Sequence, residues 1–147
     1  MRSWTLLTLL GLLVPALASA EVLPARAEHA LEHGNVRAIE RLAALYDQGR
    51  GMAPNPVAAA ALYQDAARRG SGAAQLNLAH MYLEGRGVPP DPVEAYAWAD
   101  AAAANGEPGG ERIIDQLVEV MPKPQRERAR SRAARYVELY VPDFRTG

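Results

Sequence analysis

One eleven-residue turn occurs twice in this sequence, 36 residues apart. Tyr46–Pro56 reads YDQGRGMAPNP, and Tyr82–Pro92 reads YLEGRGVPPDP. When residues 34–70 are aligned with residues 70–106, 16 of 37 positions are identical. Alanine inflates this count, but the matched Tyr, Gly and Pro residues do not depend on it. A period of this length is typical of stacked helical units, so the repeat predicts an array rather than a single irregular domain.

Each unit is predicted to form two helices joined by the repeated turn. In the second unit, Ser71 can cap the first helix, whose apolar residues recur at helical spacing. The two glycines of the turn end that helix and permit positive φ. Asp91 can then cap a second helix, with Pro92 at its first position and Glu94 in the capping-box position. A single hairpin cannot bury its apolar face, so neighbouring hairpins must stack.

Matched positions of the two units are expected to form the contacts between helices. Small residues would let helices approach closely, and larger ones would fill the remaining space. The small pairs are Ala43/Ala79 and Ala66/Ala102, and the large pairs are Leu42/Leu78 and Tyr46/Tyr82.

The spacing of these residues resembles the Sel-one-like repeat, a relative of the tetratricopeptide repeat. The second unit carries the motif as Ala74, Leu78, Ala79, Tyr82, Gly85, Gly87, Val88, Asp91, Ala95, Trp98, Ala102, Ala103 and Gly106. The first unit departs from it at Met52, Asn55 and Leu62, in place of Val, Asp and an aromatic residue. The resemblance implies a short right-handed α-solenoid of antiparallel helix pairs. It also implies an adaptor or scaffold for protein assembly, a role that such proteins often have in bacterial envelopes.

The first twenty residues are predicted to be a cleaved signal peptide. Arg2 precedes an apolar run from Leu6 to Leu17, and small residues end the segment at Ala20. The protein is therefore expected to be exported, to the bacterial periplasm or alternatively to the endoplasmic-reticulum lumen or the medium. A retained membrane anchor is the alternative, although seventeen residues with a proline are marginal for spanning.

Residues 21–147 are expected to form a single domain. Its parts would be a partial N-terminal repeat (25–33), two repeats (34–69 and 70–105), a degenerate half repeat (106–121), a capping helix (122–140) and a tail (141–147). In the degenerate half repeat, Ile114 and Val118 occupy the positions of Leu78 and Tyr82. Pro122 and Pro124 are expected to break the chain before the last helix, predicted over Gln125–Tyr140.

The last helix is basic, whereas the segment before it is acidic. Residues 21–122 hold 8 basic and 14 acidic residues, and residues 123–147 hold 7 basic and 3 acidic residues. One face of the helix is apolar, with Ala129, Ala133, Tyr136, Val137 and Tyr140, and the opposite face carries Arg128, Arg132 and Arg135. We interpret the arginines as the solvated outer face of a cap, because an exported protein rarely meets nucleic acid. Binding through this face is the alternative.

The sequence predicts no enzymatic activity, cofactor or metal site. His29, Glu32 and His33 fit the H-x-x-E-H pattern of an inverted zinc-protease motif, so a metal-dependent hydrolase is an alternative. Such an enzyme needs a third ligand and a cleft, and this motif lies on a short terminal helix. Adventitious zinc binding by these residues is a simpler interpretation of the pattern than an enzyme. Cysteine is absent, and no nucleophile–base set is apparent.

The concave face of the array is the predicted binding site. In tetratricopeptide-like solenoids the first helix of each hairpin lines this groove, and its outward positions vary between units here. The predicted groove residues are Arg37, Glu40, Asp47, Leu76, His80, Leu83, Glu84, Arg112 and Gln116, with Ala44, Gln48, Ala73 and Glu119 beside them. Leu76 and Leu83 are the most suggestive, being apolar where packing does not require it. The predicted partner is a peptide or protein; ordinary solvent exposure and self-association are the alternatives.

Overall fold

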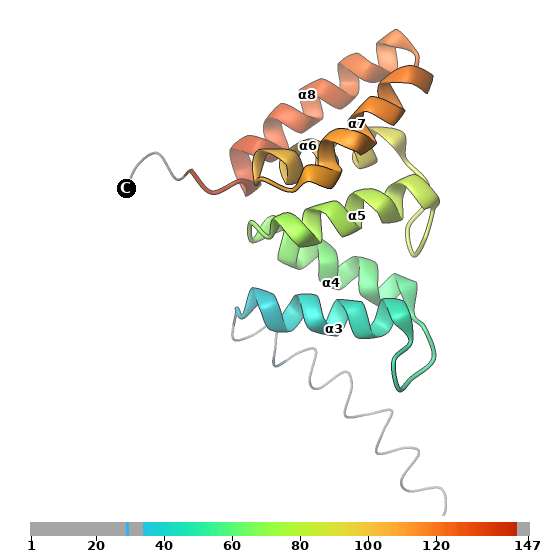
Figure 1. Ribbon diagram of the computed structural model, residues 1–147, viewed down its shortest axis with the longest axis vertical. Coiled ribbons are helices and arrows are strands. Elements are labelled where there is room, and N and C mark those ends of the chain that lie inside the picture. The colour runs from blue at the N-terminus through green and yellow to red at the C-terminus, as the bar shows by residue number, and fades with distance from the viewer. Residues whose placement is uncertain (1–28, 30–33, 144–147) are drawn as a thin grey trace, which may run out of the picture. The chain divides into compact units, whose positions relative to one another are not determined.

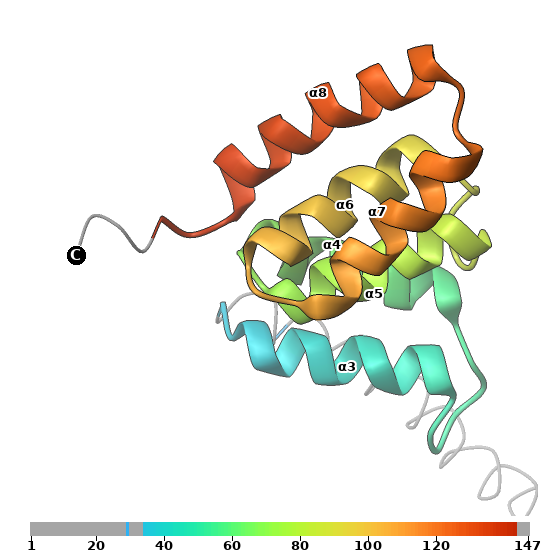
Figure 2. The ribbon, with the colours of Figure 1, turned by 45° about the horizontal axis from the view of Figure 1, so that its top comes forward.

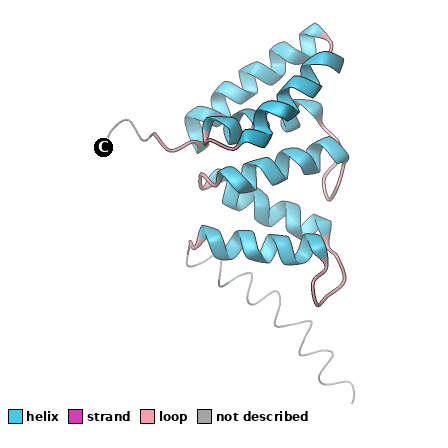
Figure 3. Cartoon of the chain, in the orientation of Figure 1, coloured by secondary structure: helices cyan, strands magenta, loops and turns pink. Residues whose placement is uncertain are grey.

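A computed structural model of the protein describes His29 and residues 34–143. Its helices are α3 (Val36–Gln48), α4 (Pro56–Arg68), α5 (Gly72–Glu84), α6 (Pro92–Ala104), α7 (Pro108–Val120) and α8 (Lys123–Tyr140). Only helices and loops occur among these residues, as Figure 3 shows, so the all-α prediction is confirmed. The chain divides into two units, Met1–Asn35 and Val36–Gly147, and all six helices belong to the second.

The helices from α3 to α7 form a short α-solenoid. Each packs against the next along the chain, in the order α3, α4, α5, α6 and α7. Figure 1 shows the first helices of the hairpins, α3, α5 and α7, in one layer, with α4 and α6 in a second layer behind them. We call the outer side of the first layer the first-helix face.

The predicted N-caps at Ser71 and Asp91 are confirmed, and Asn55 caps the second helix of the first repeat in the same way. Ser71 Oγ accepts a hydrogen bond from the Ala74 N–H at 3.1 Å, and Asn55 Oδ1 accepts one from Ala58 at 3.0 Å. Asp91 Oδ1 accepts bonds from the second and third amides of α6. These side chains satisfy amides that a helix leaves unpaired at its start, which fixes where each helix begins.

The capping box expected at α6 is wrong, because Glu94 contacts α8 instead of the cap. The Asp91 N–H donates to the Tyr82 carbonyl at 3.0 Å, while the Glu94 carboxylate accepts bonds from Arg132 and Tyr136. The first repeat has the same backbone closure, from Asn55 to the Tyr46 carbonyl at 2.8 Å. The repeated turn is therefore closed by its own backbone, and the Glu94 carboxylate of α6 is available for contact with α8.

The repeated turn also joins one repeat to the next. Arg86 forms an ion pair with Asp47 of the preceding repeat. Gly87 has φ +75°, and a Cβ there would lie 2.0 Å from the Pro56 carbonyl oxygen at the start of α4. Only glycine permits both this conformation and this approach. The Gly-Arg-Gly segment of the turn thus also forms the contact by which one repeat stacks on the other.

Alanine-rich helix contacts form the core, as the repeat predicts. Ala43, Ala79, Ala66 and Ala102 are completely buried, and Leu42 and Leu78 are buried beside them. Such small side chains let helix backbones approach, and the larger residues fill the space that remains.

The prediction that Ile114 and Val118 form the inward face of α7 is wrong, because the helix is rotated about its axis. Ile113 and Leu117 are buried, whereas Ile114 and Val118 are only partly so. The reason is that α5 is enclosed between α4 and α6, whereas α7 packs mainly on α6. A Cβ at Gly110 would come within 2.3 Å of the Ala99 carbonyl oxygen, so α7 lies directly on the α6 backbone.

Helix α8 lies along α6 and reaches α4, and its contact with α7 is marginal. Figure 2 shows it beside α6, on the side of the array away from α3. The helix begins at Lys123, two residues before the predicted start, because Pro124 falls in the first turn, where proline is tolerated. The apolar face is as predicted: Ala129 and Ala133 are buried against the array.

A buried amide junction fixes the C-terminal end of α8. The Gln75 side chain is fully buried, and its Nε2 donates to the carbonyls of Ala67 and Tyr140, both at 3.1 Å. Its Oε1 accepts a bond of 2.8 Å from Asn105 Nδ2, which also donates to the Gly70 carbonyl at 3.3 Å. The Gln75 amide is therefore paired through both its nitrogen and its oxygen, and four helices meet at this buried polar site. We call this site the amide junction.

Replacing Gly87 by alanine is expected to destabilise the protein more than replacing Gly51. Both glycines have φ near +76° and so incur a similar cost of about 1–2 kcal/mol for the left-handed conformation. A Cβ at Gly51 meets nothing within 4 Å, whereas one at Gly87 meets the Pro56 backbone. Relieving that overlap adds about 1–3 kcal/mol. Urea unfolding of the two variants measures the difference, and equal midpoints would contradict the stacking role.

Candidate interaction surfaces

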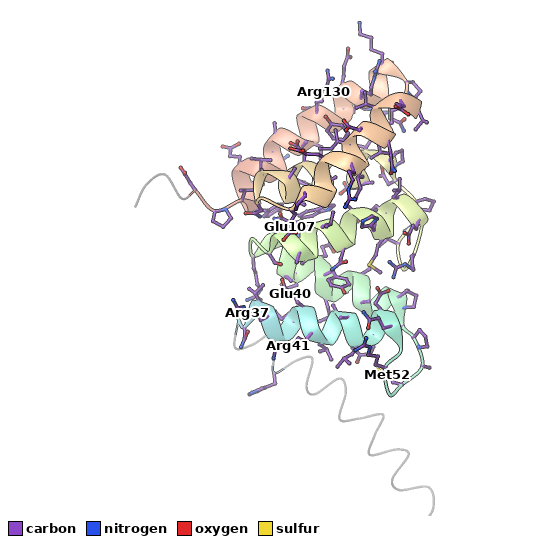
Figure 4. The ribbon with its side chains drawn as sticks, in the orientation of Figure 1. Arg37, Glu40, Arg41, Met52, Glu107 and Arg130 are labelled. Atoms are coloured by element: carbon purple, nitrogen blue, oxygen red, sulfur yellow. The ribbon has the colours of Figure 1, made fainter. Side chains whose placement is uncertain are left out.

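The structure places the predicted groove residues on the first helices of the three hairpins. Of these residues, Arg37, Leu83, Glu84, Arg112 and Gln116 are exposed, and Glu40, Asp47, Leu76 and His80 are half-buried. Figure 4 labels Arg37 and Glu40 on α3. Their role in binding stays a prediction, since their exposure alone does not show a ligand site.

Three of these residues make contacts that the sequence did not reveal, and two of these contacts join the two repeats. Glu40 accepts a hydrogen bond from the hydroxyl of Ser71, the N-cap of α5. Asp47 and Glu84 both pair with Arg86, whose pKa is raised chiefly by the hydrogen bond to Asp47. Glu40 and Asp47 are therefore engaged in holding the two repeats together, whereas Glu84 pairs within its own repeat.

The two predicted apolar groove residues differ in their surroundings. Leu76 lies against α7, since a Cβ at Gly109 would come within 2.9 Å of its Cδ2 atom. Leu83 has no such cover and is 36% exposed, on the same helix as the half-buried His80. Packing between α5 and α7 explains Leu76, so Leu83 is the exposed apolar side chain among the predicted groove residues.

A second surface lies on the other side of the array, where α8 meets α6. The Trp98 ring is buried, with its centroid 4.5 Å from that of Tyr136 and 5.5 Å from that of Tyr140. The Tyr136 hydroxyl donates to Glu94 at 2.9 Å, and Arg132 pairs with the same carboxylate. Arg132 is exposed, as predicted for the solvated face of α8, but it also pairs with Glu94 of α6.

An open cleft of about 590 Å³ adjoins these contacts. It is lined by Glu94, Arg128, Ser131, Arg132, Arg135, Tyr136, Leu139 and Tyr140. The basic residues were visible in the sequence, but the cleft was not. It exists because α8 lies beside α6, and the only sequence signal for that placement was the apolar face of α8.

The Glu94 contact also shifts the titration of Tyr136. Burial raises the pKa of the Tyr136 hydroxyl above its ordinary value, and the hydrogen bond to the Glu94 carboxylate raises it further. The neutral phenol is favoured because ionising it would place two anions side by side in a partly buried site. Burial raises the pKa of Tyr82 and Tyr63 in the same direction.

The described residues contain no group of three or more His, Asp or Glu side chains that could hold a metal ion. Of the predicted H-x-x-E-H residues, His29 is described, whereas Glu32 and His33 lie outside the described part of the chain. The predicted signal peptide, residues 1–20, also lies outside it. None of the described helices has the length and apolar character needed to span a bilayer.

The family model of the Sel1 repeat matches residues 36–71 and 72–107. Each match begins at the first helix of a hairpin and covers its turn and second helix. The chain therefore contains two Sel1 repeats, as the residue pattern predicts. Sel1 repeats typically mediate protein–protein interaction, and the fold is typically non-enzymatic.

Two solved structures of the same kind resemble the chain. One is a protective antigen present in uropathogenic Escherichia coli strains and displaying an SLR fold, with 30% identity and a TM-score of 0.74 over 78% of this chain and 25% of that one. The other is a Sel1 repeat protein from Oxalobacter formigenes, with 28% identity and a TM-score of 0.57 over 87% and 50% of the two chains. The chain thus spans a quarter to a half of these relatives. No curated protein matches it significantly.

Tyr136→Phe is expected to reduce the loss of stability at alkaline pH. Because the folded-state pKa of Tyr136 is raised, this residue stabilises the fold fully below pH about 10 and loses that contribution as the pH rises further. The variant removes this titration, so its urea midpoint should fall less than that of the wild type between pH 8 and pH 10.5. A fall of the same size in both proteins would contradict the assignment.

Proposed function

We propose that this protein is a non-enzymatic adaptor that binds a peptide or protein segment on its first-helix face. The observation that carries this proposal is the difference between the two repeats. Their packing and turn positions agree, whereas the outward positions of α3 and α5 differ. Packing accounts for the shared residues, so the outward residues that make no contact between helices are available for recognition.

Leu83 and its surroundings support the choice of this face. An exposed leucine beside a half-buried histidine, with Glu84 and Arg86 next to it, offers an apolar contact within a polar rim. Such a combination suits a helix or extended segment, which uses a few apolar anchors surrounded by polar contacts. The array is short, so a segment fits its area better than a large flat partner does.

The location we propose is the cell envelope, with the bacterial periplasm as the compartment. The basis is the sequence of the first twenty residues, where an arginine precedes an apolar run that ends in small residues. The absence of cysteine is compatible with an oxidising compartment but does not require one.

Leu83→Glu is expected to abolish crosslinking of a partner to the first-helix face. A photo-reactive residue at His80 would be activated in cells, and the adducts would be identified by mass spectrometry. One dominant adduct should form in the wild type and should be lost in the variant, because a carboxylate would replace the apolar contact.

Leu45→Glu is the matched control. Leu45 is 38% exposed, close to the 36% of Leu83, but it occupies the repeat position of the buried Met81 and so faces away from the groove positions. The adduct should persist in this variant. Loss in both variants, or an adduct unaffected by Leu83→Glu, would contradict binding at this face, and self-adducts would identify a self-associating protein.

A further inference from the structure

A continuous hollow runs along one flank of α8. The cleft of about 590 Å³ shares Arg128 and Arg132 with a hollow of about 210 Å³ that also includes Asp91, Val93 and Gln125. At its other end it shares Leu139 and Tyr140 with a hollow of about 180 Å³, which is bordered by the C-terminal end of α4. We call the combined hollow the arginine cleft.

Five arginines line the arginine cleft: Arg68, Arg69, Arg128, Arg132 and Arg135. Two of them have ion-pair partners, since Arg132 pairs with Glu94 and Arg69 pairs with Asp65. For the other three, Arg68, Arg128 and Arg135, no carboxylate lies within ion-pair distance in the described part of the chain. The cleft therefore carries positive charge that its own residues do not neutralise.

The carboxylates along the cleft are already engaged. Glu94 accepts bonds from Arg132 and Tyr136, and its side chain is only 16% exposed. Asp91 accepts the first amides of α6 as its N-cap. Neither is placed to pair with an additional arginine without giving up a bond it makes now. The charge of the unpaired arginines is thus available to a ligand.

The cleft also has an apolar component. Leu139 is 56% exposed at the point where two of the hollows join, and the half-buried rings of Tyr136 and Tyr140 form the adjoining wall. Guanidinium groups bind carboxylates through paired hydrogen bonds. Arginines beside an exposed leucine and two tyrosines therefore match a ligand that combines carboxylates with an apolar side chain.

We propose that the arginine cleft binds an extended acidic segment of another protein. Carboxylates of the segment pair with Arg128, Arg135 and Arg68, and an apolar side chain contacts Leu139. The length of the cleft suits such a segment. Helix α8 has 18 residues and so spans about 27 Å, a distance that an extended chain covers in about eight residues. A recessed, elongated hollow suits a chain better than a flat membrane surface, which would need protruding cations.

This site is separate from the first-helix face and does not rest on the function proposed for that face. It is built by α8 with α6 and α4, the second helices of the hairpins. A protein with both sites would hold two segments at once, as a scaffold does.

The test measures binding of a fluorescently labelled octapeptide by fluorescence anisotropy. The peptide has seven glutamates and one leucine near its centre, and the protein is purified after expression of its full sequence. The glutamine counterpart of the peptide is the ligand control. We expect the glutamate peptide to bind, with affinity falling as salt rises from 50 to 200 mM, and the glutamine peptide to bind at least tenfold more weakly. Equal binding of the two peptides would overturn the proposal.

Arg128→Glu combined with Arg135→Glu is expected to weaken binding of the glutamate peptide at least tenfold. The charge-matched control is Lys123→Glu with Arg130→Glu, which changes two exposed residues of α8 outside the cleft and should alter binding less than threefold. Equal losses would show non-specific attraction and overturn the site. The single variant Arg128→Ser, expected to weaken binding at least threefold, replaces the double variant if circular dichroism shows that the latter is unfolded.

Vesicles containing phosphatidylglycerol test the other source of anionic charge. We expect them to bind the wild type and the Arg128→Glu, Arg135→Glu variant equally weakly. Vesicle binding that depends on these arginines, without peptide binding, would identify a membrane site and overturn the proposal.

Discussion

The fully buried amide of Gln75 is the interaction on which the C-terminal half of the fold depends. It bonds the carbonyl of Ala67 at the end of α4, the side chain of Asn105 at the end of α6 and the carbonyl of Tyr140 at the end of α8. A buried amide is costly unless every donor and acceptor is paired, so this site tolerates one arrangement of these helix ends. The arginine cleft exists only in that arrangement.

The two repeats show how a common unit was adapted to hold an additional helix. The first repeat has Ile39 and Arg69 where the second has Gln75 and Asn105, so a polar pair occurs only beside the end of α8. Val57 is 66% exposed, whereas its counterpart Val93 is buried. The packing positions shared by the two repeats maintain the solenoid. The positions that differ, such as Gln75 and Asn105, attach α8 to it. Helix α8 therefore covers one side of the array, whereas it does not cover the first-helix face.

Much of the fold could be predicted from the sequence because its signals are local. Helix caps at Ser71, Asn55 and Asp91, glycines at positive φ and the 36-residue period all act within one hairpin or between neighbouring ones. The role of Glu94 and the cleft could not be predicted, because both depend on where α8 lies. The rotation of α7 could not be predicted because it follows from the packing of α7 mainly on α6. A helix with an apolar face can pack on several other helices, and the sequence of α8 does not indicate which of them it covers. The first-helix face was predicted, but the bonds of Glu40 to Ser71 and of Asp47 to Arg86 were not, because they join residues 31 and 39 positions apart.

Amide hydrogen exchange of a Gln75→Leu variant tests the central claim most directly. If one amide junction holds three helix ends together, exchange should quicken jointly in the segments around Ala67, Asn105 and Tyr140, which are distant in sequence. The middle of α3 should change little, because it makes no contact with the junction. Faster exchange confined to α5, with the ends of α6 and α8 as protected as in the wild type, would contradict the account.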